Sequence, residues 1–416
     1  MAWYDFLTGK VKVKEEVINN SLEYYYYKEL MGKLSKIMTN DEYRFNNSQA
    51  FIIAKTLVEV FTPIDVIADR VSGLDYYIVD KNGDRVDTAK LPKNLQRLLS
   101  KPNIFQSLQS LIYSIEFSEL ATGGSFIYPV FNKSVKTKNI DNLSQVYLIE
   151  PDKIQPVYKN LITAPFLAQN LNEFIEEFVV NHFGSRPINA DDLIVNIDNQ
   201  FNFQTLEIES PLLAVTRNIE NLVVTYSARY NSYASNGAGG VISKKNTDPS
   251  GMEVFDSDQR QKMIDEMRKT DGIVGHKNFI AISSIPIEFT RTLASIKDLM
   301  PFDETMKNAL AVLGVYGVSP FLTPYAEQTT FTNLEQAEES LWQNQIIPRG
   351  NEMILKLNRA FHLGDEYSFA FELSSTQILQ KSRAREIESD LKEIELYEKL
   401  KEIGIEKTEI LNKWID

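Results

Sequence analysis

Residues 211–243 read PLLAVTRNIENLVVTYSARYNSYASNGAGGVIS, a long helical pattern that runs directly into a glycine-rich turn and a short apolar strand. The pattern predicts a helix over 209–235. Gly237, Gly239 and Gly240 lack a Cβ atom, so they adopt positive φ at little cost and let the chain turn sharply. By itself this is also the pattern of a helix cap followed by a hairpin, because Asn-Gly commonly ends a helix. The sequence on either side decides between the two interpretations.

A second long helix is predicted at 293–315, and the residues between the two helices predict a small α/β module. The module starts with the strand pattern GGVIS at 239–243 and continues with a charged helix at 256–270. It ends with strand patterns at 273–284 and 285–290. Two long helices that flank a small insert indicate an interrupted helical pair rather than a linear array of domains.

The remainder of the chain predicts a mixed α+β structure. Apolar residues recur at helical spacing at 47–70, within 91–122, at 334–362 and at 377–414. Strand patterns occur at 73–86, where a hairpin is expected, and at 124–131, 145–158, 193–198 and 369–373. Gly123 and Gly124 are expected to end the second helical segment. Pro348 is expected to break the third, which Thr332 or Asn333 is expected to cap.

The composition excludes several classes of protein. The chain has 416 residues, a formal net charge of −13 and no cysteine, which excludes disulfides, Cys-ligated zinc, iron–sulfur clusters and cysteine nucleophiles. Its three histidines are far apart and no nucleotide-binding or hydrolase motif occurs, so no catalytic site, cofactor or metal is expected. The acidic cluster of Asp80, Asp84 and Asp87 lacks the spacing of a calcium loop. Lys244 and Lys245 form the only local excess of cations that we identify, so tight coating of nucleic acid is not expected.

The sequence contains no apolar run of 18 residues, so it predicts no transmembrane helix. The first residues, MAWYDFLTGKVKVKEE, have no apolar core after a basic start and do not resemble a signal peptide. The protein is therefore expected to stay in the cytoplasm in which it is made.

The order of these parts resembles a known family. The likeness is carried by the opening stretch, by PFDETMKNALAVLGVYGVSPFLTP at 301–324, TTFTNLEQAEESLWQNQIIP at 329–348, IEPDKIQPVY at 149–158 and the helix pair and strand at 92–128. Together these segments resemble the portal proteins, or head–tail connectors, of tailed double-stranded DNA phages. Ser319 departs from the family pattern, because it stands where the family often has the first proline of Val-Pro-Pro.

The resemblance implies an α+β, portal-type multidomain subunit that forms a ring, usually of twelve copies, at one vertex of the capsid. Its parts would be the wing at 1–208, stem helix 1 at 209–235, the clip at 236–291, stem helix 2 at 292–316, the tunnel loop at 317–331, a kinked helix and return to the wing at 332–374, and a helical crown at 375–416. The ring would be assembled in the host cytoplasm, remain in the virion, and form the channel for packaging and ejection of the genome.

Two sets of candidate site residues follow from the resemblance. The tunnel loop would present Thr323, Tyr325, Gln328, Thr329 and Thr330 to DNA in the channel. The hinge of the clip and its contact with a motor or adaptor would use Gly237, Gly239, Gly240, Lys244 and Lys245. The implied partners are other copies of the chain, the terminase large subunit, the major capsid and scaffolding proteins, a head-completion or adaptor protein, and double-stranded DNA bound weakly and without sequence preference. No membrane is implied.

Two other classes of function are consistent with parts of the sequence. A cytosolic multidomain enzyme fits the length, although no catalytic motif supports it. A non-catalytic scaffold fits the long helices, although the predicted strands and the small insert argue against a coiled coil. Size in solution distinguishes a ring of several hundred kDa from either alternative.

Overall fold

The computed structural model describes residues 47–132, 137–159, 173, 175–181, 186–198, 201–202, 207–234, 240–244, 256–258, 261–262, 287–291, 301–326, 330–373 and 380. The chain divides into two compact units. The small unit consists of Met1–Arg44 with Thr216–Asn308, and the large unit of Phe45–Val215 with Ala309–Asp416.

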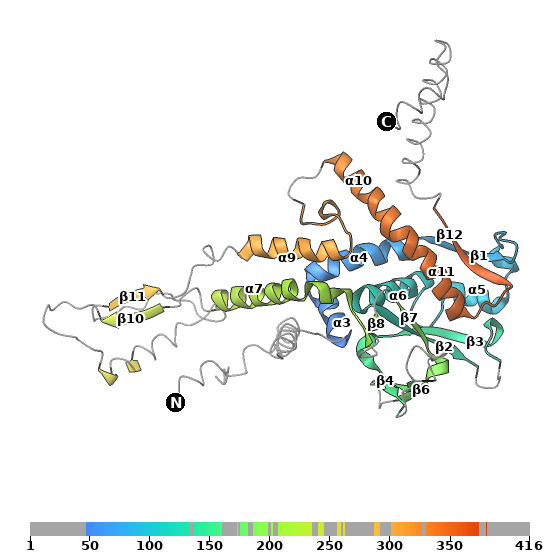
Figure 1. The fold of residues 1–416 in the computed structure, drawn as a ribbon, viewed down its shortest axis with the longest axis horizontal. Helices are drawn as coiled ribbons and strands as arrows, with labels where there is room; N and C mark the ends of the chain where they lie inside the picture. Colours follow the sequence, from blue (N-terminus) through green and yellow to red (C-terminus); the bar gives the residue numbers. More distant parts are fainter. Residues whose placement is uncertain are drawn as a thin grey trace, which may run out of the picture. The chain divides into compact units, whose positions relative to one another are not determined.

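The large unit combines helices with short antiparallel strands (Figure 1), which confirms the predicted α+β class. Its helices are α3 (Asn47–Thr56), α4 (Val58–Ser72), α5 (Lys93–Ser100), α6 (Leu108–Thr122), α10 (Phe331–Leu341) and α11 (Ile347–Phe361). Its strands are β1 (Asp75–Asp80), β2 (Gly124–Phe131), β3 (Leu143–Ile149), β4 (Ile154–Tyr158), β5 (Ile175–Val180), β6 (Arg186–Asn189), β7 (Ile194–Ile197), β8 (Phe201–Asn202), β9 (Glu207–Ile208) and β12 (Tyr367–Glu372).

Two three-stranded sheets, with strand orders β3-β2-β7 and β4-β5-β6, form the β part of this unit together with the pairs β1-β12 and β8-β9. All these pairings are antiparallel. The β4-β5-β6 sheet buries Ile154, Ile175 and Phe178 against Phe126 of β2, so the two sheets share one apolar cluster.

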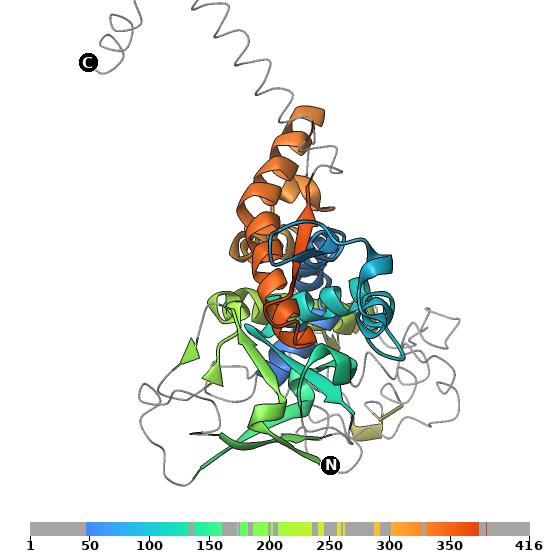
Figure 2. The ribbon, with the colours of Figure 1, turned by 90° about the vertical axis from the view of Figure 1, so that its right-hand side faces the viewer.

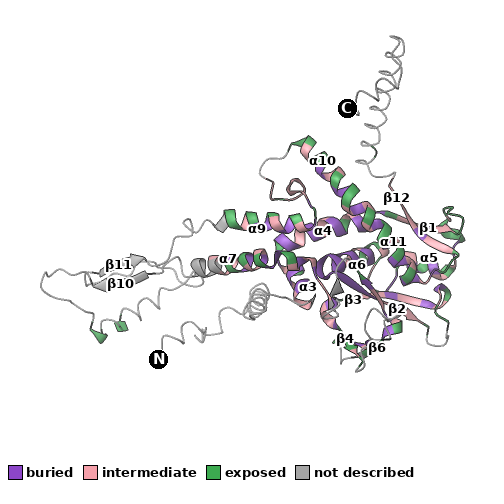
Figure 3. Cartoon of the chain, in the orientation of Figure 1, coloured by how far each residue is buried: buried purple, intermediate pink, exposed green. Residues whose placement is uncertain are grey.

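Helix α6 is the centre of the core and is largely buried (Figure 3). Leu111, Ile112 and Ile115 are almost completely buried, and the helix packs against α3, α4 and β2. Burial of each such side chain stabilises the fold by about 1.5–3 kcal/mol. The helix therefore fixes the position of every element that it contacts.

The junction between α6 and β2 requires glycine at two successive positions. Gly123 caps α6 with φ +82°, and a Cβ atom there would lie 2.2 Å from the backbone oxygen of Glu209. A Cβ atom on Gly124 would lie 2.8 Å from the backbone oxygen of Asn196. No other residue fits this close approach of three chain segments, which is why the predicted helix end is confirmed.

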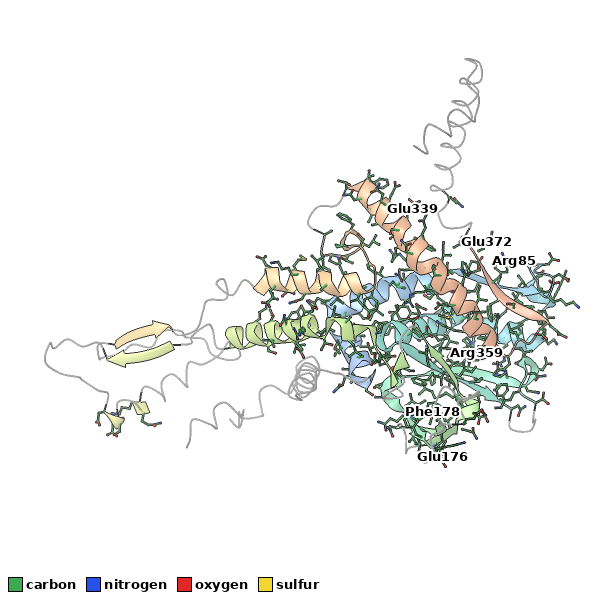
Figure 4. All side chains as sticks on the ribbon, in the orientation of Figure 1. Arg85, Glu176, Phe178, Glu339, Arg359 and Glu372 are labelled. Carbon is green, nitrogen blue, oxygen red and sulfur yellow. The ribbon has the colours of Figure 1, made fainter. Side chains whose placement is uncertain are left out.

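The hairpin predicted at 73–86 is only partly formed. Strand β1 pairs along its whole length with β12, and the expected second arm is reduced to an antiparallel bridge between Val79 and Arg85 and a hydrogen bond from the Val86 N–H group to the backbone oxygen of Ile78, at 2.9 Å. Arg85 instead binds Asp75, at 3.7 Å, and Glu372 of β12, at 3.2 Å (Figure 4). A partner strand almost 300 residues away along the chain replaces the local one.

The acidic cluster before Arg85 forms a turn. The Asp80 carboxylate accepts hydrogen bonds from the backbone N–H groups of Asn82, at 2.8 Å, and Asp84, at 3.0 Å. These bonds lower the pKa of Asp80. The carboxylate thus has a local structural role.

Two further boundaries differ from the sequence prediction. The helix predicted at 47–70 is two helices, α3 and α4, which are separated at Leu57. The strands predicted at 145–158 are present, but β3 and β4 belong to different sheets and do not pair with each other.

Pro348 does not break the helix that contains it. A π-helical segment, Trp342–Ile346, joins α10 to α11, and Figure 2 shows them as one continuous orange helix. Pro348 lies in the first turn of α11, where the missing N–H group is tolerated. The wider π turn takes the place of the predicted break.

The small unit contains the long helix of the opening pattern and the first part of the second long helix. Helix α7 (Thr216–Ala234) follows a 3₁₀ turn at Pro211–Val215, and α9 (Pro301–Val315) begins in the small unit and ends in the large one. Within the small unit, Asn218 of α7 donates a hydrogen bond to Asn308 of α9 at 2.9 Å. Arg229 donates to Thr305 at 3.0 Å, so two points of α7 contact α9.

The insert between these helices contains the strand pair β10 (Gly240–Lys244) and β11 (Ile287–Arg291), which are antiparallel. These strands confirm the patterns at 239–243 and 285–290. Most of the predicted charged helix, the strand pattern at 273–284 and the helical segment at 377–414 lie outside the described residues.

Candidate functional site

The segment that joins α9 to α10 is attached to the core where it leaves α9. Tyr316 is buried, and its hydroxyl group donates to the backbone oxygen of Leu120 at the end of α6, at 2.9 Å. Burial raises the pKa of Tyr316 well above its usual value, so the hydroxyl remains a donor. Gly317 follows with φ +63°, and a Cβ atom there would lie 3.0 Å from the Gln345 side chain of the π segment. The end of α9 is therefore held between α6 and the π segment.

Two of the predicted tunnel-loop residues, Thr323 and Tyr325, are half-buried and bonded to each other. The Thr323 hydroxyl donates to the backbone oxygen of Pro320 at 2.8 Å and accepts from the backbone N–H of Tyr325 at 3.3 Å. Burial and the negative charge of Glu59 raise the pKa of Tyr325 to about 12. This part of the segment is thus packed on the large unit, close to the start of α4.

Thr330 caps α10, which corrects the expectation that Thr332 or Asn333 would do so. Its exposed hydroxyl accepts a hydrogen bond from the backbone N–H of Asn333 at 3.3 Å. The first turn of α10 places Phe331, 70% exposed, beside this cap. Gln328 and Thr329, the two other predicted loop residues, lie outside the described residues.

The predicted hinge and contact residues are described only at the strand pair. Gly240 and Lys244 are the first and last residues of β10, opposite Arg291 and Ile287 of β11. Gly237, Gly239 and Lys245 lie outside the described residues.

A buried network of charged side chains links α6, α11 and the end of β7. Arg349 of α11 binds Glu116 of α6 at 2.7 Å and Asp198 at 3.2 Å. Lys356, two turns further along α11, binds Glu119 of α6. All three carboxylates are at most 4% exposed. The network joins α6 to α11, which are more than 230 residues apart along the chain, and it joins α11 to Asp198, which lies 151 residues before Arg349.

Neighbouring polar groups complete this network. Ser125 donates to the free oxygen of Glu119 at 2.7 Å, and Asn196 donates to Ser125 at 3.0 Å. The second carboxylate oxygen of Glu116 has no hydrogen-bond partner, and its charge adds to burial in raising the pKa of the Tyr76 hydroxyl. Three buried carboxylates thus face two cations, and the half-exposed Glu352 also lies 3.7 Å from Lys356.

The excess carboxylate has an electrostatic consequence. Burial raises the pKa of Glu119 to about 7, against the opposing effect of Lys356 and with a further contribution from Glu116. Burial lowers the pKa of Arg349, but Glu116 and Asp198 outweigh it and the net pKa is raised. Glu119 therefore titrates near neutral pH, whereas the pKa values of Arg349 and Lys356 are both raised and these side chains stay charged.

No residue of the network lines the pocket that the structure describes. The described pocket, of about 290 Å³, lies elsewhere in the large unit and is lined by Phe51, Lys55, Phe61, Gln106, Tyr113, Ser114, Phe117, Leu148 and Glu150. In the part of the chain that the structure describes, no cluster of three or more His, Asp or Glu side chains is arranged to hold a metal ion. Across the same ranges, no helix combines the length and apolar character that crossing a bilayer requires. The network connects α11 to α6 and to the end of β7.

A family model settles what kind of protein this is. The model, described as phage portal protein, matches residues 58–393 of the chain. The chain belongs to the phage portal protein family. The predicted resemblance is thereby confirmed over most of the sequence, and the protein is a portal, or head–tail connector, protein.

Several solved structures share the fold of this chain. A chain of the virion of a native gene transfer agent (GTA) particle is 14% identical, with a TM-score of 0.56, and the match covers 90% of this chain and 99% of that one. In the neck of an empty GTA particle computed with C6 symmetry, a chain is 15% identical with a TM-score of 0.54, and the match covers 79% of this chain and 84% of that one. In the neck of a native GTA particle computed with C12 symmetry, a chain is 14% identical with a TM-score of 0.52, and the match covers 79% of this chain and 83% of that one. No curated protein matches the sequence.

Sequence reasoning missed two features of this portal protein. The buried network was not predicted, although Glu116 and Glu119 lie within a largely apolar segment, IYSIEFSELA, which is an available signal. The statement that Lys244 and Lys245 are the only local excess of cations is wrong. Lys90, Lys93, Arg97 and Lys101 are four exposed cations in a stretch without any acidic residue.

Proposed function

We propose that this portal protein assembles into a closed ring of about twelve copies at one capsid vertex and forms the channel through which DNA enters and leaves. Two findings support the proposal: the chain belongs to the phage portal protein family, and its fold is similar to that of a chain in a GTA neck computed with C12 symmetry. In this proposal the wing, stem, clip, tunnel loop and crown have the boundaries given by the sequence pattern.

The observation that carries the proposal is the pair of long helices around a small insert. Helices α7 and α9 bond to each other through Asn218 and Asn308 and through Arg229 and Thr305, and the strand pair β10–β11 lies between them in the sequence. Helix α7 also exposes Val224, an apolar side chain on a face that α9 does not cover. Copies of the same helices in a ring would cover such faces.

The charge of the chain fits a channel through which DNA slides. Twelve copies at −13 each would carry about −156. DNA that is repelled by most of the wall releases few counterions and does not stall on it. In the proposed tunnel loop, Gln328 and Thr329 supply neutral polar groups, and Thr323, Tyr325 and Thr330 hold the loop in place.

The remaining partners belong to the same proposal. The clip, with Lys244 and Lys245 at the end of β10, would dock the terminase large subunit during packaging and a head-completion or adaptor protein afterwards. Capsid and scaffolding proteins would surround the wing. The portal itself has no catalytic role in this proposal, and nucleotide hydrolysis is left to the terminase. We propose no second function, because no observation in the described part of the chain favours one.

The test is the assembly state of the purified full-length protein. Mass photometry and negative-stain images viewed along the axis should show rings of several hundred kDa. Val224→Glu should reduce ring formation, whereas Asn221→Glu, which adds the same charge to an exposed polar position of the same helix, should not. Protein that stays monomeric at micromolar concentration, with and without capsid protein, would contradict the ring.

A further inference from the structure

The large unit carries a basic surface on and around α5. Between Asp87 and Glu116 the chain contains no acidic residue, although its net charge is −13. The same stretch contains four cations: Lys90, Lys93, Arg97 and Lys101. The local net charge is therefore positive over almost thirty residues of an acidic chain, which indicates a distinct basic segment.

Helix α5 brings these cations to one side. Leu95 and Leu98 of α5 are fully buried and attach the helix to the core. Lys93, Arg97 and Lys101 follow one another at intervals of four residues, so they lie in a row on the opposite, exposed side. Lys90 precedes the helix and is also exposed.

The row is not neutralised from within the chain. None of the four cations has a carboxylate within 4 Å among the described residues, although Asp141 lies in a 3₁₀ turn that packs against α5. Arg97 donates instead to neutral oxygens, the Asn94 side chain at 2.9 Å and the backbone of Ser144 at 2.6 Å. These bonds hold the guanidinium group in position and leave its charge uncompensated.

An apolar tip continues the row. Ile104 and Phe105 follow Lys101 after three and four residues, and they are 58% and 81% exposed. Phe105 is the most exposed of the large apolar side chains in the described part of the chain. Exposure of an aromatic side chain at the end of a basic row is typical of a binding surface rather than of a random loop.

The tip is held by a buried amide. Asn103 is 2% exposed, and its side-chain oxygen accepts from the backbone N–H groups of Phe105, at 2.9 Å, and Gln106, at 2.8 Å. Its NH₂ group donates to the backbone oxygen of Val146 at 2.9 Å and to the Gln106 side chain at 2.9 Å. A buried residue that satisfies all its hydrogen bonds fixes the loop, so Phe105 is presented in a preorganised position.

We propose that this surface, consisting of Lys90, Lys93, Arg97, Lys101, Ile104 and Phe105, binds an acidic segment of a partner protein that also carries an apolar side chain. The row of cations matches carboxylates spaced along an extended or helical segment, and Phe105 and Ile104 match the apolar residue.

Duplex DNA would match the row of cations but not the exposed apolar side chains of Ile104 and Phe105. Phosphates would pair with the four cations, yet full burial of Phe105 would require it to wedge between base pairs, which costs a few kcal/mol of unstacking. A polypeptide supplies both halves of the contact, because apolar anchors with a charged rim are the usual composition of a protein interface.

The test uses the full-length protein and three fluorescein-labelled probes: a peptide of Glu-Glu-Leu-Phe repeats, its Gln-Gln-Leu-Phe counterpart, and a short DNA duplex. Anisotropy at physiological salt should show that the acidic peptide binds more tightly than the other two. The triple variant Lys93→Glu, Arg97→Glu and Lys101→Glu should weaken this binding about tenfold or more. Phe105→Ser should weaken it while leaving its dependence on salt unchanged.

The matched control is a triple reversal at exposed lysines on other elements, Lys81→Glu, Lys262→Glu and Lys307→Glu, which changes the net charge equally. It should bind the acidic peptide as the unmodified protein does. Equal affinity of both triple variants would overturn the proposal, as would equal binding of the glutamine peptide. Tighter binding of the DNA duplex, lost only in the α5 variant, would overturn it in favour of a nucleic acid.

Discussion

Lys356 of α11 donates a hydrogen bond to the carboxylate of Glu119 on α6, and both side chains are buried. Beside them, Arg349 holds Glu116 and Asp198. The consequence is that the junction of α6 and α11 depends on the protonation and on the pairing of a few charged groups. Removing water from such groups costs several kcal/mol per ion unless each has a partner.

The first prediction concerns pH. Burial raises the pKa of Glu119 to about 7, from a usual value of 4.5, so the folded protein binds a proton that the unfolded chain has lost. The stability linked to this group is fully present below pH 4.5 and is lost as the pH rises through about 7. Glu119→Gln cannot titrate, so the fall in the free energy of unfolding between pH 5 and 8 should shrink by about 1–3 kcal/mol. Urea denaturation at several pH values measures this.

Glu352→Gln is the control for Glu119→Gln. Glu352 lies 3.7 Å from the same Lys356, but it is half-exposed. Its replacement should leave the dependence of stability on pH unchanged. A full pH dependence in Glu119→Gln would show that a different group binds the proton.

The second prediction concerns Arg349. Arg349→Met keeps much of the side-chain volume but leaves Glu116 and Asp198 buried without their cation. The loss of stability should be about 3–5 kcal/mol, because an unpaired buried charge is far more costly than a broken surface pair. Arg85→Met removes the exposed pairs with Asp75 and Glu372 and should cost less than about 1 kcal/mol. Similar losses in the two variants, measured by thermal or urea denaturation, would contradict the importance of the network.

The third prediction compares two glycines, in order to distinguish the cost of a left-handed backbone from the cost of close packing. Gly123 and Gly83 both have positive φ, +82° and +88°, but only Gly123 has a backbone atom in the place of a Cβ. Gly83→Ala should cost about 1 kcal/mol, the usual penalty for a side chain in the left-handed region. Gly123→Ala should cost clearly more, because α6 and β2 must also move away from Glu209. Equal melting temperatures for the two variants would show that the junction is not tightly packed.

The sequence predicted those parts of the fold that depend on neighbouring residues. The pattern at 211–243 gave the helix and the strand after it, and Gly123 gave the end of α6, because periodicity and glycine conformation are local properties. The pairing of β1 with β12 could not be predicted in this way. A local turn at Lys81–Asp84 offers the same strand a nearby partner, and only packing decides between them.

The sequence predicted less of the candidate site than of the fold. Thr330 was identified as part of the loop but not as the cap of α10, because Thr332 and Asn333 are equally good caps by type. Glu116 and Glu119 have helical spacing that suits either a solvated face or a buried one. Their cations, on α11, are brought to them only by the tertiary fold.

The last prediction concerns the proposed tunnel loop. Thr330 caps α10 and Thr323 bonds within its own turn, so substitutions at these two residues would disturb the ends of the loop, and the test uses Gln328 and Thr329 instead. Gln328→Lys with Thr329→Lys would add about 24 positive charges to a ring of twelve and bind DNA phosphates, releasing counterions. Packaging should then be slower at low salt and recover at high salt, while ring assembly stays intact. Gln328→Ser with Thr329→Ser, which is also neutral and polar, should package at the unmodified rate at both salt concentrations. The measurement is the packaging rate in a reconstituted system. If the lysine variant packages a full genome at the unmodified rate in low salt, the loop does not face DNA, and the channel wall lies elsewhere on the subunit.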